Sequence, residues 1–126
     1  MPECLVVDDS RTVRRVARRM LEARGFSVRE AEDGQQALDA CRAALPTLVL
    51  LDWNMPVMDG ITFLHRARAE FGPDEPRIML CTTESDFSRI VAALEGGAQE
   101  YIMKPFDDEI LAGKLEVLGL LPDEAA

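Results

Sequence analysis

Residues 48–60 read LVLLDWNMPVMDG, an apolar run that meets a carboxylate at Asp52 and passes into a loop ending at a glycine. A short apolar run that stops at loop residues is typical of a strand buried on both faces of a parallel sheet. Beyond the loop, Ile61, Leu64 and Ala67 recur at the spacing of one buried helix face. The stretch therefore predicts one strand–loop–helix unit.

Four further units of the same kind flank this one. We expect the other strands at residues 4–7, 26–31, 77–81 and 98–103, and the other helices between residues 10 and 25, 34 and 46, 87 and 94, and 107 and 118. On the first helix the spacing predicts a buried face of Val13, Val16, Ala17, Met20 and Leu21. Strands joined by right-handed helical crossovers give an α/β fold, here a (βα)5 doubly wound five-stranded parallel sheet in a flavodoxin-like three-layer sandwich.

The composition excludes several classes of protein. The net charge of −9 argues against a nucleic-acid-binding surface, because phosphate backbones attract basic proteins. No apolar run approaches the roughly 20 residues that a bilayer span needs, so we expect no membrane insertion. Cys4, Cys41 and Cys81 lie in apolar contexts without CxxC spacing, so we expect them to be core residues of a reduced, cytoplasmic protein.

Charged and hydroxyl side chains follow four of the expected strands. Asp8 and Asp9 follow the first strand, and Asp52 follows the third. Thr82 follows the fourth strand and Lys104 the fifth. In doubly wound sheets the ligand site lies outside the carboxyl ends of the strands, where the strand order reverses. We therefore expect these side chains to form one site.

Three carboxylates in one site require a compensating charge, because a pair at about 4 Å costs about 1 to 4 kcal/mol. Lys104 supplies one positive charge, and Mg²⁺ is suited to supply the rest. Asp9 and Asp52 are the expected metal ligands, and Asp8 is expected to act through the water shell of the metal. Asp52 can then attack a phosphoryl group as an oxygen nucleophile, while Lys104 and Thr82 contact the phosphoryl oxygens.

Simpler interpretations remain for each feature. Asp8 and Asp9 could start a helix and Thr82 could cap one, although their coincidence at four strand ends favours the phosphoryl site. A flavodoxin-like cofactor protein would share the fold class, but its phosphate loop needs N–H groups and hydroxyls where this chain has two carboxylates. A small phosphohydrolase would need a general acid and usually a cap over its substrate, and the loop at 52–59 has no room for a cap.

Four motifs together cover the expected strand ends: VVDDS at 6–10, LDWNMPVMDG at 51–60, TT at 82–83 and YIMKPF at 101–106. They resemble the receiver domains of two-component response regulators, and the DWNMP stretch is similar to the chemotaxis-type, CheY-like single-domain regulators. The resemblance implies a CheY-like fold for a receiver domain at residues 1–121, followed by a short tail at 122–126. It implies Mg²⁺ as cofactor and phosphorylation of Asp52 by a histidine kinase or a histidine phosphotransfer protein. It also implies that the domain is no enzyme beyond catalysing its own phosphorylation and dephosphorylation.

The same resemblance assigns roles to single residues. It makes Asp8 and Asp9 the acidic pair and the backbone carbonyl of Asn54 a metal ligand. It makes Thr82 and Tyr101 a switch, in which the tyrosine turns inward as the threonine moves toward the phosphate.

Three further expectations concern the motif neighbours. The Lys104–Pro105 bond is expected to be cis. Asn54 and Glu84 resemble residues that admit and orient hydrolytic water, which implies a short-lived phosphoryl group. Thr83 departs from the small residue that the family commonly has after the switch threonine, and it could narrow the space in which the tyrosine moves.

The expected partners follow from the same family. The resemblance implies that a downstream target binds the surface of the fourth helix, fifth strand and fifth helix. It also implies that this protein acts as a monomer and belongs to a chemotaxis or motility pathway. A phosphoryl sink or shuttle in a relay is the alternative role.

The basic run on the first helix is expected to be a solvated face or else a docking face for a phosphotransfer partner: Arg11, Arg14, Arg15, Arg18 and Arg19. His65 is expected to be exposed.

Overall fold

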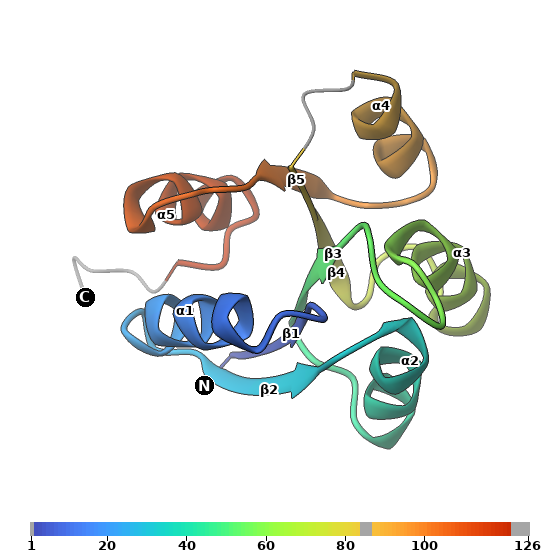
Figure 1. Ribbon diagram of the computed structural model, residues 1–126, viewed down its shortest axis with the longest axis horizontal. Helices are drawn as coiled ribbons and strands as arrows, with labels where there is room; N and C mark the ends of the chain where they lie inside the picture. Colours follow the sequence, from blue (N-terminus) through green and yellow to red (C-terminus); the bar gives the residue numbers. More distant parts are fainter. Residues whose placement is uncertain (1, 84–86, 122–126) are drawn as a thin grey trace.

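The computed structural model describes residues 2–83 and 87–121, in which strands and helices alternate along the chain (Figure 1). The strands are β1 (Glu3–Val7), β2 (Ser27–Ala31), β3 (Leu48–Asp52), β4 (Arg77–Thr82) and β5 (Glu100–Met103). The helices are α1 (Arg11–Glu22), α2 (Gly34–Ala43), α3 (Gly60–Phe71), α4 (Phe87–Glu95) and α5 (Asp108–Val117).

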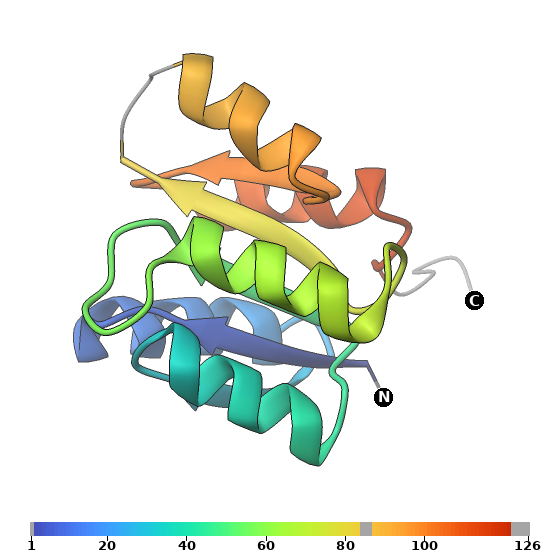
Figure 2. The same ribbon diagram turned by 90° about the vertical axis from the view of Figure 1, so that its right-hand side faces the viewer.

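The strands form one sheet in the order β2-β1-β3-β4-β5, with every neighbouring pair parallel. Helices α1 and α5 cover one face of the sheet, and α2, α3 and α4 cover the other (Figure 1). The strand order reverses between β1 and β3, and all strands point toward one edge, from which the β3–α3 loop extends (Figure 2). The predicted doubly wound fold is confirmed, and its switch point lies where the ends of β1 and β3 meet.

Apolar strand residues alternate between two cores, one on each face of the sheet. Leu5 and Val7 belong to the core under α2 and α3, while Cys4 and Val6 belong to the core under α1 and α5. This alternation follows from the two-residue period of a strand and explains why the strands are continuous apolar runs.

The cysteines are buried and unpaired with one another, as expected of small core residues. Burial raises the pKa of Cys4 and of Cys81 to about 12, and that of Cys41 to about 11. Their thiols therefore stay protonated, which fits a packing role.

Three strand starts differ from the prediction by one or two residues: β1 begins one residue earlier, at Glu3, and β2 and β5 begin later. The N–H of Phe26 bonds the Leu21 carbonyl, and the N–H of Ala98 bonds the Ala93 carbonyl, so both residues close the preceding helix instead of opening a strand. Strands β2 and β5 begin only at Ser27 and Glu100.

The predicted buried face of α1 was wrong at one position. Val16 is 47% exposed, whereas Arg14 is only 7% exposed and lies with Ala17 and Leu21 against the sheet. The buried face of α1 thus includes Arg14 and leaves out Val16, and the interpretation of the whole basic run as a solvated face fails at Arg14. Within the described residues, no helix has the length and apolar character that crossing a membrane requires.

Candidate functional site

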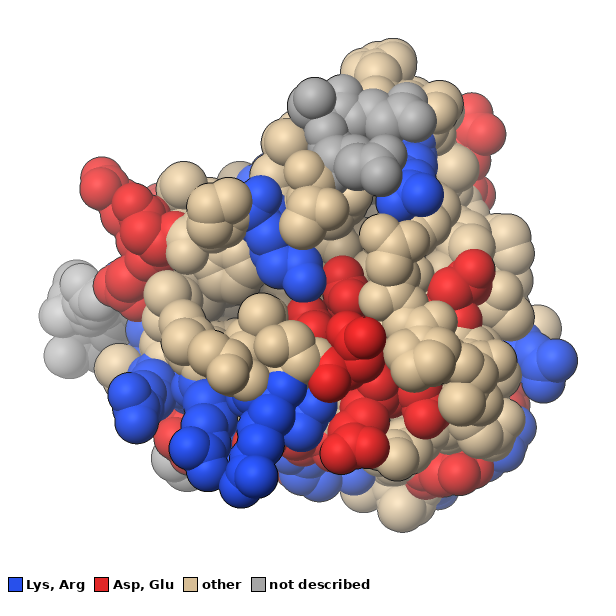
Figure 3. Space-filling model, viewed as in Figure 1, with Lys and Arg blue, Asp and Glu red and all other residues tan. Residues whose placement is uncertain are grey.

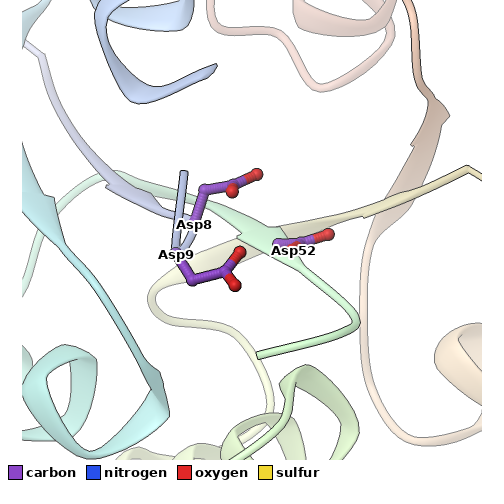
Figure 4. Close-up of side chains that lie close together, drawn as sticks. All are labelled: Asp8, Asp9 and Asp52. Carbon is purple, nitrogen blue, oxygen red and sulfur yellow. The ribbon is translucent and has the colours of Figure 1, made fainter. Parts of the chain in front are cut away.

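Three carboxylates converge at the ends of β1 and β3. Asp8 and Asp9 follow β1 and Asp52 ends β3, and one oxygen from each lies within 4.8 Å of the others (Figure 4). Asp8 and Asp52 are buried, while Asp9 is exposed. An all-oxygen donor set with one open side suits a hard divalent cation such as Mg²⁺, which retains water and phosphate ligands.

Lys104 reaches this cluster from the end of β5. Its Nζ lies 2.8 Å from Oδ2 of Asp8 and 3.2 Å from Oδ1 of Asp52. The backbone N–H of Lys104 donates to the carbonyl of Thr82 at 2.8 Å, which joins the ends of β4 and β5. The Lys104–Pro105 peptide bond is cis. One ammonium group therefore bridges the two buried carboxylates.

The charges at this edge shift one another's protonation. Burial and then the charge of Asp8 raise the pKa of Asp52, and the nearby Lys104 only partly opposes this. Burial alone would lower the pKa of Lys104, but its hydrogen bond to Asp8 and the charge of Asp52 outweigh burial and raise it. The lysine thus stays charged, and the nucleophile candidate carries an electrostatic cost that a cation would remove.

Backbone contacts hold Asp52 at the mouth of the site. The N–H of Trp53 donates to the Cys81 carbonyl at 3.1 Å, and the N–H of Gly60 donates to the Trp53 carbonyl at 2.9 Å. A Cβ atom at Gly60 would lie 2.3 Å from the Asp52 carbonyl oxygen, so only glycine fits at this crossing of the chain. The LDWNMPVMDG stretch therefore folds back on the strand that it leaves.

The acidic pair is anchored by a local network. The N–H of Ser10 donates to Oδ1 of Asp8 at 2.8 Å, and Oγ of Ser10 accepts from the N–H of Val13 as the cap of α1. Nη1 of Arg14 donates to the Asp8 carbonyl at 2.7 Å. The sequence reasoning missed this contact, although the helical spacing of Arg14, Ala17 and Leu21 was a signal for it.

The remaining predicted site residues lie at different depths. Thr82 is buried at the end of β4, one residue beyond Cys81, which pairs with Asp52 in the sheet, and Asn54 is exposed in the β3–α3 loop. Tyr101 is half-buried, and Nζ of Lys114 lies 4.0 Å from the centre of its ring. The predicted dephosphorylation residue Glu84 lies outside the described residues.

A groove of about 540 Å³ borders the site between α1 and the β5–α5 loop. It is mainly apolar and is lined by Val13, Val16, Thr83, Phe106 and Lys104, among others. Thr83 is exposed and faces this groove. The side chain of Val16 that was expected in the core thus lines a surface beside the carboxylates.

Comparisons with known proteins agree with this geometry. The family model described as the response regulator receiver domain matches residues 4–116. Chemotaxis protein CheY1 of Helicobacter pylori is 41% identical over 116 residues, which cover 90% of this chain and 94% of that protein. A chemotaxis protein CheY homolog of Campylobacter jejuni is 41% identical over 125 residues, covering 97% of this chain and 96% of that protein. The solved structure of chemotaxis response regulator CheY4 of Vibrio cholerae has a TM-score of 0.87 at 31% identity and covers 94% of this chain and 98% of that one.

Proposed function

The chain belongs to the family of response regulator receiver domains, and from that premise we propose that Asp52 accepts a phosphoryl group from a histidine kinase or a histidine phosphotransfer protein. One observation carries the proposal. The ammonium of Lys104 lies within 3.2 Å of two buried carboxylates that converge with a third. Such a concentration of charge at the switch point is costly in a resting protein and useful for phosphoryl transfer.

The proposed reaction uses a carboxylate oxygen of Asp52 as the nucleophile. It attacks the phosphorus of a phosphohistidine, an O–P bond forms, and the P–N bond breaks with its electron pair left on the imidazole. The product is an acyl phosphate. Lys104, already 3.2 Å from Asp52, is placed to neutralise the added oxygens, and the Thr82 hydroxyl is proposed to donate to another.

Mg²⁺ is the proposed cofactor. Asp9 and Asp52 would hold it directly, with the backbone carbonyl of Asn54, and Asp8 would act through a water ligand. When bound, it supplies positive charge opposite the phosphoryl oxygens. Burial and the charge of Asp8 raise the pKa of Asp52. A bound cation would lower this pKa again, because it favours the charged carboxylate.

We propose the groove beside α1 as the docking site of the phosphodonor protein. Its floor is apolar at Val13, Val16 and Phe106. Arg11, Arg15 and Arg19 are exposed on α1, and basic side chains gather over that helix beside the acidic centre (Figure 3). A helix with an apolar stripe and an acidic rim would fit both features.

Reversing one charge of this face tests the docking proposal. Arg15→Glu should slow phosphotransfer from a phosphohistidine protein about tenfold or more, because it repels an acidic partner. Phosphorylation by acetyl phosphate should be unchanged. Arg66→Glu, an exposed arginine on α3, is the matched control. Equal slowing by both variants, or equal loss with acetyl phosphate, would contradict docking at α1.

The proposed output is a phosphorylation-dependent change of the surface formed by α4, β5 and α5, which a target protein reads. Phe87 on α4 and Val117 on α5 are 75% and 72% exposed. The helices α4 and α5 lie on either side of β5, the edge strand of the sheet (Figure 1), and Tyr101 on β5 is half-buried with Lys114 over its ring. Because the relatives are named chemotaxis proteins, we propose that this target belongs to a chemotaxis pathway in the cytoplasm.

Intact-mass measurement tests the phosphoacceptor directly. The chain is incubated with acetyl phosphate, with and without Mg²⁺, beside Asp52→Asn. We expect one phosphoryl adduct on the wild type that requires Mg²⁺, and none on the variant. An adduct that forms equally on Asp52→Asn would overturn the proposal.

A further inference from the structure

Arg14 lies buried between the acidic pair and the neighbouring strand β2. Its Nη1 donates to the Asp8 carbonyl at 2.7 Å, and its Nε donates to Oε1 of Glu30 at 2.9 Å. Nη2 lies 3.8 Å from Oε1 of Glu32. The side chain is 9% exposed, so the guanidinium spans the gap between α1 and β2 with most of its surface out of water.

A buried guanidinium fixes geometry because its donors lie in one plane and its charge is permanent. Glu30 holds one edge of the plane, and the other edge meets the Asp8 carbonyl. That carbonyl belongs to the peptide group that joins Asp8 to Asp9. The directions in which both carboxylates leave the backbone depend on how this peptide is rotated.

Other contacts hold the peptide groups on either side, and Arg14 holds the Asp8–Asp9 peptide itself. The N–H of Asp8 bonds the Ala31 carbonyl, which fixes the peptide before it. The N–H of Ser10 bonds the Asp8 side chain, which fixes the peptide after Asp9. The carbonyl between them is bound by Arg14.

We infer that Arg14 is a positioning residue that orients the Asp8–Asp9 peptide so that both carboxylates face a divalent cation. The inference rests on the proposed function, in which that acidic pair holds Mg²⁺. Arg14 itself touches neither the cation nor the phosphoryl group; it acts through the backbone of its neighbours, as residues behind metal ligands commonly do.

Arg18 provides a matched comparison one turn along the same helix. It too binds Glu30 and donates to a carbonyl, in this case that of Val28 on β2 at 2.8 Å. It also bonds Glu22 on its own helix at 3.4 Å. Arg14 and Arg18 thus tie α1 to the same strand through the same carboxylate, and they differ in that Arg14 reaches the acidic pair.

The test compares Arg14→Met, Arg14→Lys and Arg18→Met in full-length protein. Mg²⁺ affinity is measured by titration of Trp53 fluorescence and by calorimetry, and the unfolding temperature is measured without metal. Arg14→Met should weaken Mg²⁺ binding by about ten- to a hundredfold, the range found for groups that orient metal ligands. Arg14→Lys keeps the positive charge and can replace one of the hydrogen bonds of Arg14. Its Mg²⁺ affinity should lie between those of Arg14→Met and the wild type.

Arg18→Met should lose comparable thermal stability and bind Mg²⁺ within about twofold of the wild type, because the bonds that it loses, to Glu30, Glu22 and the Val28 carbonyl, do not involve the acidic pair. Equal weakening of Mg²⁺ binding by Arg14→Met and Arg18→Met would overturn the inference. An unchanged Mg²⁺ affinity in both Arg14→Lys and Arg14→Met would overturn it too. Neither result would contradict the proposed function. A wild-type protein that binds no Mg²⁺ would overturn both. Should Arg14→Met fail to fold, the comparison of Arg14→Lys with Arg18→Met decides.

Discussion

The interior of the sheet and its carboxyl edge follow opposite rules. In the interior, strand residues such as Leu5, Leu51 and Ile78 are fully buried among apolar neighbours. The buried polar side chains among the described residues are Asp8, Arg14, Asp52 and Thr82, and they belong to the edge or contact it. The interior stabilises the fold, while the edge collects like charges that the same fold must hold together. Removing a carboxylate from the edge should therefore raise stability, whereas removing apolar contacts from the interior should lower it.

The largest expected effect is a loss in the interior. Leu51 is fully buried in β3, one residue before Asp52. Leu51→Ala should destabilise the protein by about 2 to 5 kcal/mol, because apolar contacts are lost and a cavity is left. Urea unfolding followed by circular dichroism measures this. A loss below about 1 kcal/mol would mean that the interior does not supply the stability assigned to it.

A substitution at Gly60, where the chain crosses the Asp52 backbone, should lower stability nearly as much. In Gly60→Ala the new methyl group would lie 2.3 Å from the Asp52 carbonyl oxygen. The backbone must shift, at a cost of about 1 to 3 kcal/mol, and Mg²⁺ binding should weaken with it. Gly113→Ala in α5 is the control, since a Cβ atom there meets nothing within 4 Å. That variant should gain up to about 1 kcal/mol. Equal unfolding midpoints for the two variants would refute the close approach.

Removing a negative charge from the edge should raise the stability of the metal-free protein instead of lowering it. Asp52→Asn should stabilise the metal-free protein by about 1 kcal/mol, the lower end of the repulsion between two nearby carboxylates. Burial and Asp8 raise the pKa of Asp52 in the folded protein above its ordinary 3.8, so the wild type loses stability as pH rises from about 4 through that raised value.

The advantage of Asp52→Asn should therefore be small below pH 4 and grow as the pH rises. Saturating Mg²⁺ should abolish it, because the cation stabilises the wild type by binding the folded state. Thermal melts of both proteins at several pH values check this. A variant less stable than the metal-free wild type at neutral pH would show that Lys104 fully compensates the cluster.

A similarly small effect is expected in the β3–α3 loop. Val57 is 82% exposed and has φ of 68°, a left-handed conformation that β-branched residues adopt at a cost. Val57→Asn should raise stability by about 1 kcal/mol, because asparagine tolerates this region. Val117→Asn, at a valine that is 72% exposed and ends helix α5, should give no gain. A gain in both would mean that replacing an exposed apolar side chain, and not relieving the backbone at Val57, is the cause.

The sequence predicted most of the fold because its signals are local. Apolar runs mark the strands, and the switch point follows from the alternation of strands and helices. The parallel sheet then brings Asp8, Asp52 and Lys104 to one edge without any long-range information. In the structure Lys104 contacts both Asp8 and Asp52.

What sequence reasoning missed depends on pairing across space. Arg14 is one arginine in a run of five, and its burial depends on Glu30, which lies on another strand. Val16 fits an apolar helix pattern but lines the groove, because α1 turns Arg14, Ala17 and Leu21 toward the sheet. The approach of Gly60 to Asp52 is likewise a property of the folded loop.

Chemical trapping of the phosphoryl group tests the central claim most directly. The wild type is treated with acetyl phosphate and Mg²⁺ and then reduced with borohydride, which converts a phosphoaspartate into homoserine. Peptide mass spectrometry should find homoserine at position 52 and unmodified aspartate at positions 8 and 9. Reduction at position 8 or 9 in place of 52, or at none of the three, would contradict the account.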